Sequence, residues 1–484
     1  MIKRICNVLG NKLFYVCILM VVLLFDTVLY IHDYTGPAMK LFLMWGLLII
    51  GVDFFKDRRL WNTRCLKWLL LFCGLYLITA FINERSYLMS NLKTLSYMVL
   101  FSVLLYGHDK NKKMIEWKKE VRTIMVVFVW TTVLLSFICL MTYIFQINIE
   151  ILTGDGYMHI GMADNRLWGL YNPNIGGNID VLSIIFSVML LLTLQKKRWY
   201  KVAALVLNII LQYVCLILTS SRTSLYTLII CLFAFLFLTF ASKFKIFSIR
   251  TLKGFSLNLI MAFLVAGSLY GISAPVKNAM AYVPGIVNVD LGKLVEKKTE
   301  KDEEDKKKIK KDSSKKKIEL TRLEVLENRD GGILTGRLYI WKAGLKAWQR
   351  SPIFGISKNT IYDYSKEYIS DKQWLIPMET SLHNGYITVL VASGIVGFIV
   401  YILFLIFNII PMIKTAFIHM QKENYILFAG CLVVVASFLM IECFEARIVY
   451  RTEIFTAMFW LICGLVFNYT EIVKLEDEID SSNS

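Results

Sequence analysis

The sequence predicts an all-α polytopic membrane protein with about twelve transmembrane helices. Its 484 residues are 56% apolar, and their mean hydropathy of +0.56 lies well above that of a soluble globular domain. Apolar runs close to the ~20 residues that span a bilayer recur along the chain. These runs are expected to be helical, because backbone polar groups in lipid must be satisfied within the segment itself.

Twelve of these runs are expected to cross the membrane. They lie at residues 13–31, 38–55, 66–82, 88–106, 123–147, 179–194, 202–218, 225–240, 255–272, 385–407, 425–441 and 453–468. The first is longer than the apolar part of a signal peptide, and no small-residue cleavage site follows it. We therefore expect it to remain as a span.

Lysine and arginine clusters in the short loops set the expected orientation. They lie near residues 56–59, 112–122, 196–198, 243–253 and 414–422, all on one side of the predicted bundle. The positive-inside rule makes that side cytoplasmic, together with both termini. We expect one domain, residues 1–484, in the plasma membrane, with outer loops at 148–178 and 273–384. The net charge of +17 is then spread over membrane-flanking loops, which argues against a nucleic-acid-binding face.

The large outer loop, between the ninth and tenth spans, contains a low-complexity insert. Lys293–Lys317 holds twelve lysines and seven acidic residues. It therefore has too little apolar surface to offset the entropy cost of ordering the segment. We expect a solvated insert, with contact to anionic cell-wall polymer as the alternative. After it, apolar residues recur at helical spacing up to Ser351-Pro352 and predict a helix that packs on the bundle or the bilayer: Leu338, Trp341, Leu345 and Trp348.

Several arginines fall on the predicted outer side, against the usual charge bias of short loops. Arg222 is the clearest, because it stands in a tight and otherwise apolar hairpin between two spans. An arginine at membrane depth normally faces a cavity or a partner, and its planar fork suits phosphate. Arg166 and Arg337 are weaker candidates for the same role. For Arg447 and Arg451 we expect a salt bridge with Glu445 or Glu453.

His383 and Asn384 stand where the large loop enters the tenth span, followed by Gly394 and Gly397. A neutral imidazole can take a proton from a hydroxyl near neutral pH. The simpler alternative is a histidine satisfied by a loop carbonyl. With outward arginines in the same chain, the base interpretation fits transfer from a lipid-linked diphosphate donor to a hydroxyl. The two glycines would allow close helix packing behind the histidine.

The chain resembles the O-antigen ligase and polymerase superfamily of bacterial envelope glycan assembly. The resemblance rests on motifs that occur in the family's order: RLWGLYNPN from Arg166 to Asn174, Ser221-Arg222, Gly336-Arg337 with Trp341 and Pro352-Ile-Phe-Gly355, and His383-Asn384 with Gly394 and Gly397. The first 150 residues match only in having spans. The lysine-rich insert departs from the family pattern.

This resemblance implies a glycosyltransferase that uses an undecaprenyl-diphosphate-linked glycan on the outer membrane face, without nucleotide sugar, metal or other cofactor. His383 would position or deprotonate the acceptor hydroxyl. Arg166, Arg222 and Arg337 would hold the diphosphate, with Asn174, Asn384, Gly394 and Gly397 in supporting positions.

Three functions stay open at this point. We favour a polymerase that joins repeat units into capsule, exopolysaccharide or O-antigen, partly because the spacing of Arg166 and Gly177 resembles a polymerase loop motif. A ligase that moves the glycan to a lipid or wall acceptor shares the same frame. A lipid-linked oligosaccharide flippase or exporter suits twelve spans, but no repeat relates the two halves. Other polysaccharide assembly proteins are possible partners. The sequence contains no CxxC pair, and we expect no metal site.

Overall fold

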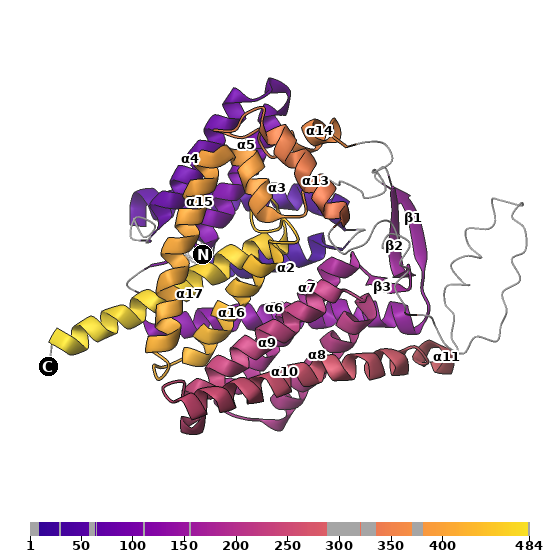
Figure 1. Cartoon of the computed structure of the whole chain (residues 1–484), viewed down its shortest axis with the longest axis vertical. Helices are drawn as coiled ribbons and strands as arrows, with labels where there is room; N and C mark the ends of the chain where they lie inside the picture. Colours follow the sequence, from indigo (N-terminus) through magenta and orange to yellow (C-terminus); the bar gives the residue numbers. More distant parts are fainter. Residues whose placement is uncertain are drawn as a thin grey trace, which may run out of the picture. The chain divides into compact units, whose positions relative to one another are not determined.

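The computed structural model describes residues 9–28, 31–57, 63, 65–109, 112–153, 156–287, 320, 335–369 and 381–482 (Figure 1). These residues are helical apart from one small sheet, which confirms the predicted all-α fold. Within these ranges nine helices are long and apolar enough to cross a membrane, and two further apolar helices are shorter. The polytopic membrane fold is therefore confirmed, whereas the number twelve stays a prediction. The insert Lys293–Lys317 lies outside the described residues.

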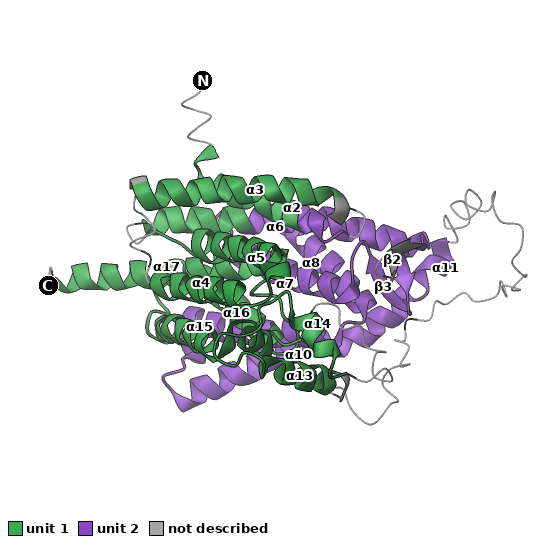
Figure 2. Ribbon diagram, turned by 90° about the horizontal axis from the view of Figure 1, so that it is seen from above, with its two compact units in different colours: residues 1–23, 34–124, 325–484 green, residues 24–33, 125–324 purple. Residues whose placement is uncertain are grey.

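Contacts within the chain divide it into two compact units (Figure 2). Unit 1 comprises Met1–Leu23, Tyr34–Ile124 and Val325–Ser484, and unit 2 comprises Leu24–Asp33 and Met125–Glu324. Each unit is described by itself below. His383 and Arg337 belong to unit 1, and Arg166 and Arg222 belong to unit 2.

In its described residues, the regular secondary structure of unit 1 is helical. Its elements are most of α2 (Lys12–Asp26) and α3 (His32–Val52), η1 (Asp53–Asp57), α4 (Leu66–Ile82), η3 (Arg85–Tyr87), α5 (Leu88–Val99), η4 (Leu100–Leu105), the start of α6 (Met114–Ile144), α13 (Thr335–Trp348), α14 (Ile361–Lys366), α15 (Gly385–Ile418), α16 (Tyr425–Ile441) and α17 (Ile454–Ser482). The membrane part of α17 is 89% buried, because α15 and α16 pack against it. It forms the core of this unit.

Helix α13 confirms the helix predicted between the lysine-rich insert and Ser351-Pro352. It runs from Thr335 to Trp348, as the spacing of its apolar residues predicts, and it packs against α15. The Trp341 indole donates to the Leu382 carbonyl oxygen at 2.9 Å. Since Leu382 precedes His383, this tryptophan helps to fix the entry to α15.

Unit 2 combines a helical bundle with one antiparallel sheet. Its elements are the rest of α6, β1 (Ile149–Thr153), β2 (Gly156–Ala163), β3 (Arg166–Gly169), α7 (Pro173–Leu192), α8 (Trp199–Thr219), α9 (Arg222–Lys243), η5 (Lys245–Phe247), α10 (Leu252–Met280) and α11 (Val283–Val287). The strands pair in the order β1-β2-β3. Helix α7 is the central element, since it packs against both α8 and α9.

Two boundaries in unit 2 differ from the expected spans. The loop expected at 148–178 contains the three strands, and α7 starts inside it because Pro173 stands at the first turn and Asn172 caps the helix. Helix α10 continues through Pro275 to Met280 instead of ending at residue 272. Hydropathy predicts only the apolar part of a helix. The helix itself continues for as long as its backbone hydrogen bonds can form.

Candidate active site

His383 is held at the start of α15 by hydrogen bonds on both sides. Its backbone N–H donates to Ser381 Oγ at 3.1 Å, and its φ of +49° is in the left-handed region that few non-glycine residues adopt. Asn384 caps α15, because its Oδ1 accepts from the Ile387 N–H at 2.9 Å. The Asn384 Nδ2 donates to the Cys443 carbonyl oxygen at 2.9 Å. The histidine therefore stands at a fixed joint between α15 and the segment that follows α16.

A carboxylate from that following segment orients the imidazole. His383 Nδ1 lies 3.3 Å from Glu445 Oε2, and Arg337 Nη2 lies 3.6 Å from Glu445 Oε1. Burial raises the pKa of Glu445, but the hydrogen bond to His383 and the charges of Arg447 and Arg337 outweigh it, so that its pKa falls to about 2. An ionised carboxylate can only accept, so Nδ1 carries the proton and Nε2 of a neutral imidazole is the acceptor.

The segment 442–453 also confirms the salt bridges expected for its two arginines. Arg447 Nη1 donates to Glu453 Oε2 at 2.8 Å, and Arg447 Nη2 lies 3.8 Å from Glu445 Oε2. Arg451 Nη1 donates to Glu453 Oε1 at 2.7 Å. Burial acts to raise the pKa of Glu453, but the two arginines reverse the effect and lower it. Alternating charges thus hold the segment that presents Glu445 to His383.

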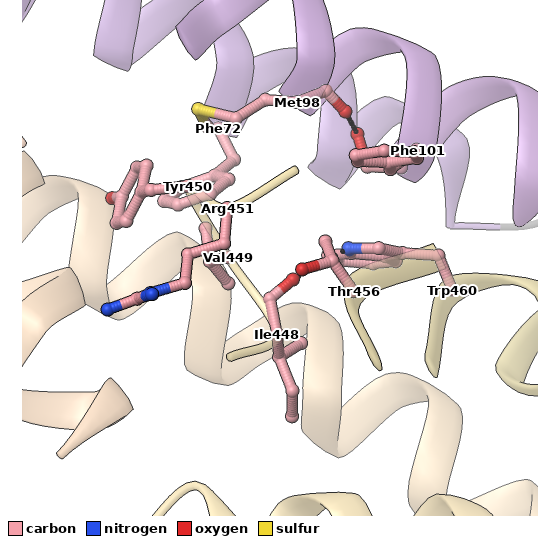
Figure 3. A pocket seen from close by; sticks show the side chains of 10 residues that line it. Phe72, Met98, Phe101, Ile448, Val449, Tyr450, Arg451, Thr456 and Trp460 are labelled. Carbon is pink, nitrogen blue, oxygen red and sulfur yellow. Dashed lines mark hydrogen bonds between the residues drawn. The ribbon is translucent and has the colours of Figure 1, made fainter. Parts of the chain in front are cut away.

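A small cavity in unit 1 adjoins the same segment (Figure 3). Its lining is mainly apolar and aromatic and includes Phe72, Phe101 and Trp460. Arg451 also lines it, but its guanidinium points away from the Trp460 ring (Figure 3) and pairs with Glu453. We therefore assign the cavity to aromatic packing behind the 442–453 segment rather than to the polar site.

Gly394 marks a break in α15 that the continuous apolar run of residues 385–407 does not predict. Its φ of +65° and ψ of −176° are non-helical, and a Cβ there would lie 2.2 Å from the Ile353 carbonyl oxygen. Backbone hydrogen bonds join segment 352–357 to both sides of the break: Ile356 N to Val391 O, Ser357 N to Ala392 O, Ile395 N to Pro352 O and Val396 N to Ile353 O. Close approach is needed at Gly394, as expected, but to this segment rather than to another helix. At Gly397 a Cβ would meet the Ser393 side chain.

Arg166 and Arg222 of unit 2 both lie at the turn between α8 and α9. Arg166 begins β3, where its Nε donates to the Thr219 carbonyl oxygen at 2.8 Å and its Nη2 to Asn174 Oδ1 at 3.0 Å. Arg222 is exposed and begins α9, which Ser221 caps by accepting from the Ser224 N–H. The structure therefore brings Arg166 and Asn174 together and places both beside the turn that carries Arg222.

The distance between Gly177 and the same turn explains part of the motif around Arg166. A Cβ at Gly177 would lie 2.7 Å from Ser224 Oγ, so α7 and α9 can pack closely only with glycine there. Ser224 Oγ in turn donates to Asn178 Oδ1 at 2.9 Å. Arg166 and Gly177 therefore both contact the turn region between α8 and α9, Arg166 at Thr219 and Gly177 at Ser224.

The pairing of His383 with Glu445 is the contact that sequence reasoning missed. Glu445 is expected to form a salt bridge, and it does form one with Arg447. Its second role depends on two segments that are 62 residues apart. The available signal in the sequence was an acidic residue in the short, arginine-rich segment between α16 and α17. That signal does not identify His383 as its partner. Among the described residues, no group of three or more His, Cys, Asp or Glu could hold a metal ion.

Comparison with known protein families gives a match. Residues 203–402 match the model of a family described as O-antigen ligase, and this range contains Arg222, Arg337 and His383. No curated protein matches the chain. Over the matched residues the predicted resemblance to the O-antigen ligase and polymerase superfamily is confirmed, and the match supports a function in surface polysaccharide assembly for this multi-pass membrane protein.

Proposed function

We propose that the protein polymerises undecaprenyl-diphosphate-linked repeat units into surface polysaccharide on the outer face of the plasma membrane. The observation that carries this proposal is the contact of His383 Nδ1 with the ionised Glu445. It leaves Nε2 as the atom that can accept a proton. The family match to an O-antigen ligase supports glycosyl transfer as the reaction class.

The reaction that fits these residues is a displacement at the anomeric carbon of the donor sugar. The acceptor hydroxyl oxygen forms the new bond to that carbon, and its proton passes to His383 Nε2. The bond between the anomeric carbon and the diphosphate oxygen breaks, and its electron pair leaves with the lipid diphosphate. Glu445 stabilises the imidazolium that forms, because it accepts from Nδ1.

Cationic side chains have the second task, which is to stabilise negative charge on the leaving diphosphate. We assign it to Arg166 and Arg222, whose guanidinium groups can bind phosphate oxygens in pairs. Asn174 holds Arg166 in place. Arg337 is engaged with Glu445, so it tunes the charge beside the base, and its role as a diphosphate ligand stays a prediction.

A ligase that transfers a finished glycan to a lipid or wall acceptor is the second candidate, and the match to a family described as O-antigen ligase is equally compatible with it. Both candidates share the donor and the base and differ only in the acceptor. A flippase or exporter is the third, and the match to a ligase family does not support it.

Purified protein in lipid discs, supplied with a lipid-diphosphate repeat unit, tests the proposal. A ladder of products is expected for a polymerase, and a single transfer to an added acceptor indicates a ligase. We expect the ladder to persist in EDTA, because the proposed reaction uses no metal. Absence of any new glycosidic bond, under conditions in which the protein binds the donor, contradicts the proposed reaction and favours transport.

The His383→Ala variant tests the base in the same assay. Turnover should fall roughly 10²–10⁴-fold, the range for general acid–base catalysis, while donor binding changes little. His383→Gln keeps a polar group but cannot accept the proton. Full activity of the glutamine variant would restrict His383 to positioning the acceptor.

A further inference from the structure

Lys277 joins the two arginines at the turn between α8 and α9 of unit 2. This lysine lies near the end of α10 and donates from Nζ to Ser220 Oγ at 2.9 Å. Ser220 follows Thr219, whose carbonyl oxygen accepts from Arg166, and Arg222 begins α9 two residues later. The charges of Arg166 and Arg222 both act on the Lys277 ammonium. Three cations contributed by β3, α9 and α10 thus share one four-residue turn.

Three cations at one turn form a site that suits an anion, and Lys277 gives the strongest support for it. Like charges repel, and Lys277 is only half exposed, so solvent screens it incompletely. Within the described part of the chain, no acidic side chain is among the charges that act on Lys277. The helix ends do not compensate either. The carbonyl end of α8 and the N–H end of α9 meet at this turn, and their partial charges have opposite sign.

We infer that Lys277 is a third cationic ligand for the diphosphate of the lipid-linked donor, acting beside Arg166 and Arg222. This inference rests on the proposed function. A lysine supplies a compact point charge, whereas an arginine supplies a planar fork. The diphosphate gains negative charge when its bond to the sugar breaks, so a third cation stabilises the leaving group more than the intact donor. Ser220 positions the ammonium towards the turn.

Equilibrium binding to the full chain in neutral-lipid discs tests this role, with polyprenyl diphosphate and polyprenyl monophosphate as the probes. Lys277→Met keeps the length of the side chain and removes its charge. It should weaken diphosphate binding roughly 10- to 100-fold, as expected for the loss of one hydrogen bond to a charged group. Monophosphate binding should weaken less. Lys277→Arg keeps the charge and should stay within a few-fold of the wild type.

Lys253→Met is the matched control, since it removes a lysine from the opposite end of the same helix. It should leave both affinities unchanged. Ser220→Gly provides a second variant that does not depend on the folding of Lys277→Met. It removes the hydroxyl that holds Lys277, and glycine accepts the positive φ of +53° at this position. It should weaken diphosphate binding in the same direction but by less.

The outcomes separate the inference from the proposed function. Unchanged diphosphate affinity in folded Lys277→Met, or in Ser220→Gly if the methionine variant does not fold, overturns the inference. If Arg222→Ala loses diphosphate binding while Lys277→Met keeps it, the diphosphate site stands and Lys277 is excluded from it. If the wild-type protein does not distinguish diphosphate from neutral polyprenol, the proposed donor is wrong as well.

Discussion

Two carboxyl groups three residues apart illustrate how environment divides like side chains into unlike roles. Glu445 faces His383, Arg447 and Arg337, and its pKa falls to about 2. Glu442 is 2% exposed and accepts from the backbone N–H groups of Arg447 and Ile448. Burial outweighs these hydrogen bonds and raises its pKa to about 8. One carboxylate is therefore charged next to the base, and the other is a protonated structural link at neutral pH.

The charged member of this pair gives a prediction for catalysis. Glu445→Gln keeps the shape of the side chain but removes the charge that holds the Nδ1 proton and stabilises the imidazolium. Turnover should fall roughly 10- to 100-fold, in line with the loss of a charge-assisted hydrogen bond. The affinity for the lipid-diphosphate donor should change little, because the proposed diphosphate ligands are other side chains.

Turnover and donor affinity of the wild type and of Glu445→Gln, measured separately, check this role. A merely structural role for Glu445 would lower both together, or lower the level of folded protein. Glu445→Asp retains the charge at shorter reach and should keep partial turnover. Wild-type turnover in Glu445→Gln at normal protein level would contradict the orientation of His383 by this carboxylate.

The protonated member gives a prediction for stability. The pKa of Glu442 is raised from 4.5 to about 8 on folding, so below pH 4.5 both states hold the proton and its contribution to stability is complete. Between pH 4.5 and 8 only the folded state keeps the proton, and stability falls as pH rises. Glu442→Gln cannot ionise and should flatten this dependence. Thermal unfolding in detergent at several pH values measures it, with the exposed Glu150→Gln as control; parallel curves for wild type and Glu442→Gln would count against a buried neutral Glu442.

Among the secondary-structure elements, α15 is interrupted at Gly394, where the backbone of segment 352–357 forms hydrogen bonds with the helix. Residues 391 and 392 offer carbonyl oxygens that a continuous helix would use, and segment 352–357 takes them. In a membrane-spanning helix such a break is tolerated only where other backbone groups satisfy it. Gly355, with a φ of +80°, makes the opposite side of the joint. The short Pro-Ile-Phe-Gly motif thus acts as a hydrogen-bonding partner for the helix.

Gly394→Ala should therefore destabilise the protein by about 1–3 kcal/mol or more, since alanine is strained at a φ of +65° and its Cβ would collide with backbone. Gly267→Ala is the control. It lies within α10 with nothing within 4 Å of the added Cβ, and alanine should be neutral or mildly stabilising there. Thermal unfolding of both variants decides the point. Equal unfolding temperatures would show that the joint is not a fixed part of the fold.

At the scale of the whole molecule, the orientation in the membrane stays a prediction from the loop charges. Single cysteines at Asp164, in the turn between β2 and β3, and at Lys196, between α7 and α8, test it in a cysteine-free background. The first should react with an impermeant thiol reagent in intact cells, and the second only after lysis. The reverse pattern would invert the protein and remove the outer-face chemistry.

The features that could be predicted from the sequence alone are those that depend on residues close together in the chain. Hydropathy over about twenty residues specifies membrane helices, because lipid forces each segment to satisfy its own backbone. Local patterns also specified α13 from its apolar spacing, and the salt bridges of Arg447 and Arg451 with a glutamate a few residues away. The resemblance gave His383 and the arginines as candidates, and the family match covers three of them.

Which distant residues meet depends on how the helices and loops pack. Glu445 reaches His383 from 62 residues away, Lys277 reaches Ser220 from 57 residues away, and the backbone at Ile353 meets Gly394. Each partner carries an ordinary local signal: a loop carboxylate, a lysine near a helix end, a glycine in an apolar run. Their chemistry arises when packing removes water and brings charges within a few ångströms, where electrostatic interactions and close contacts become strong. That proximity is a property of the folded chain, because no local pattern encodes the partner of a residue far away in sequence.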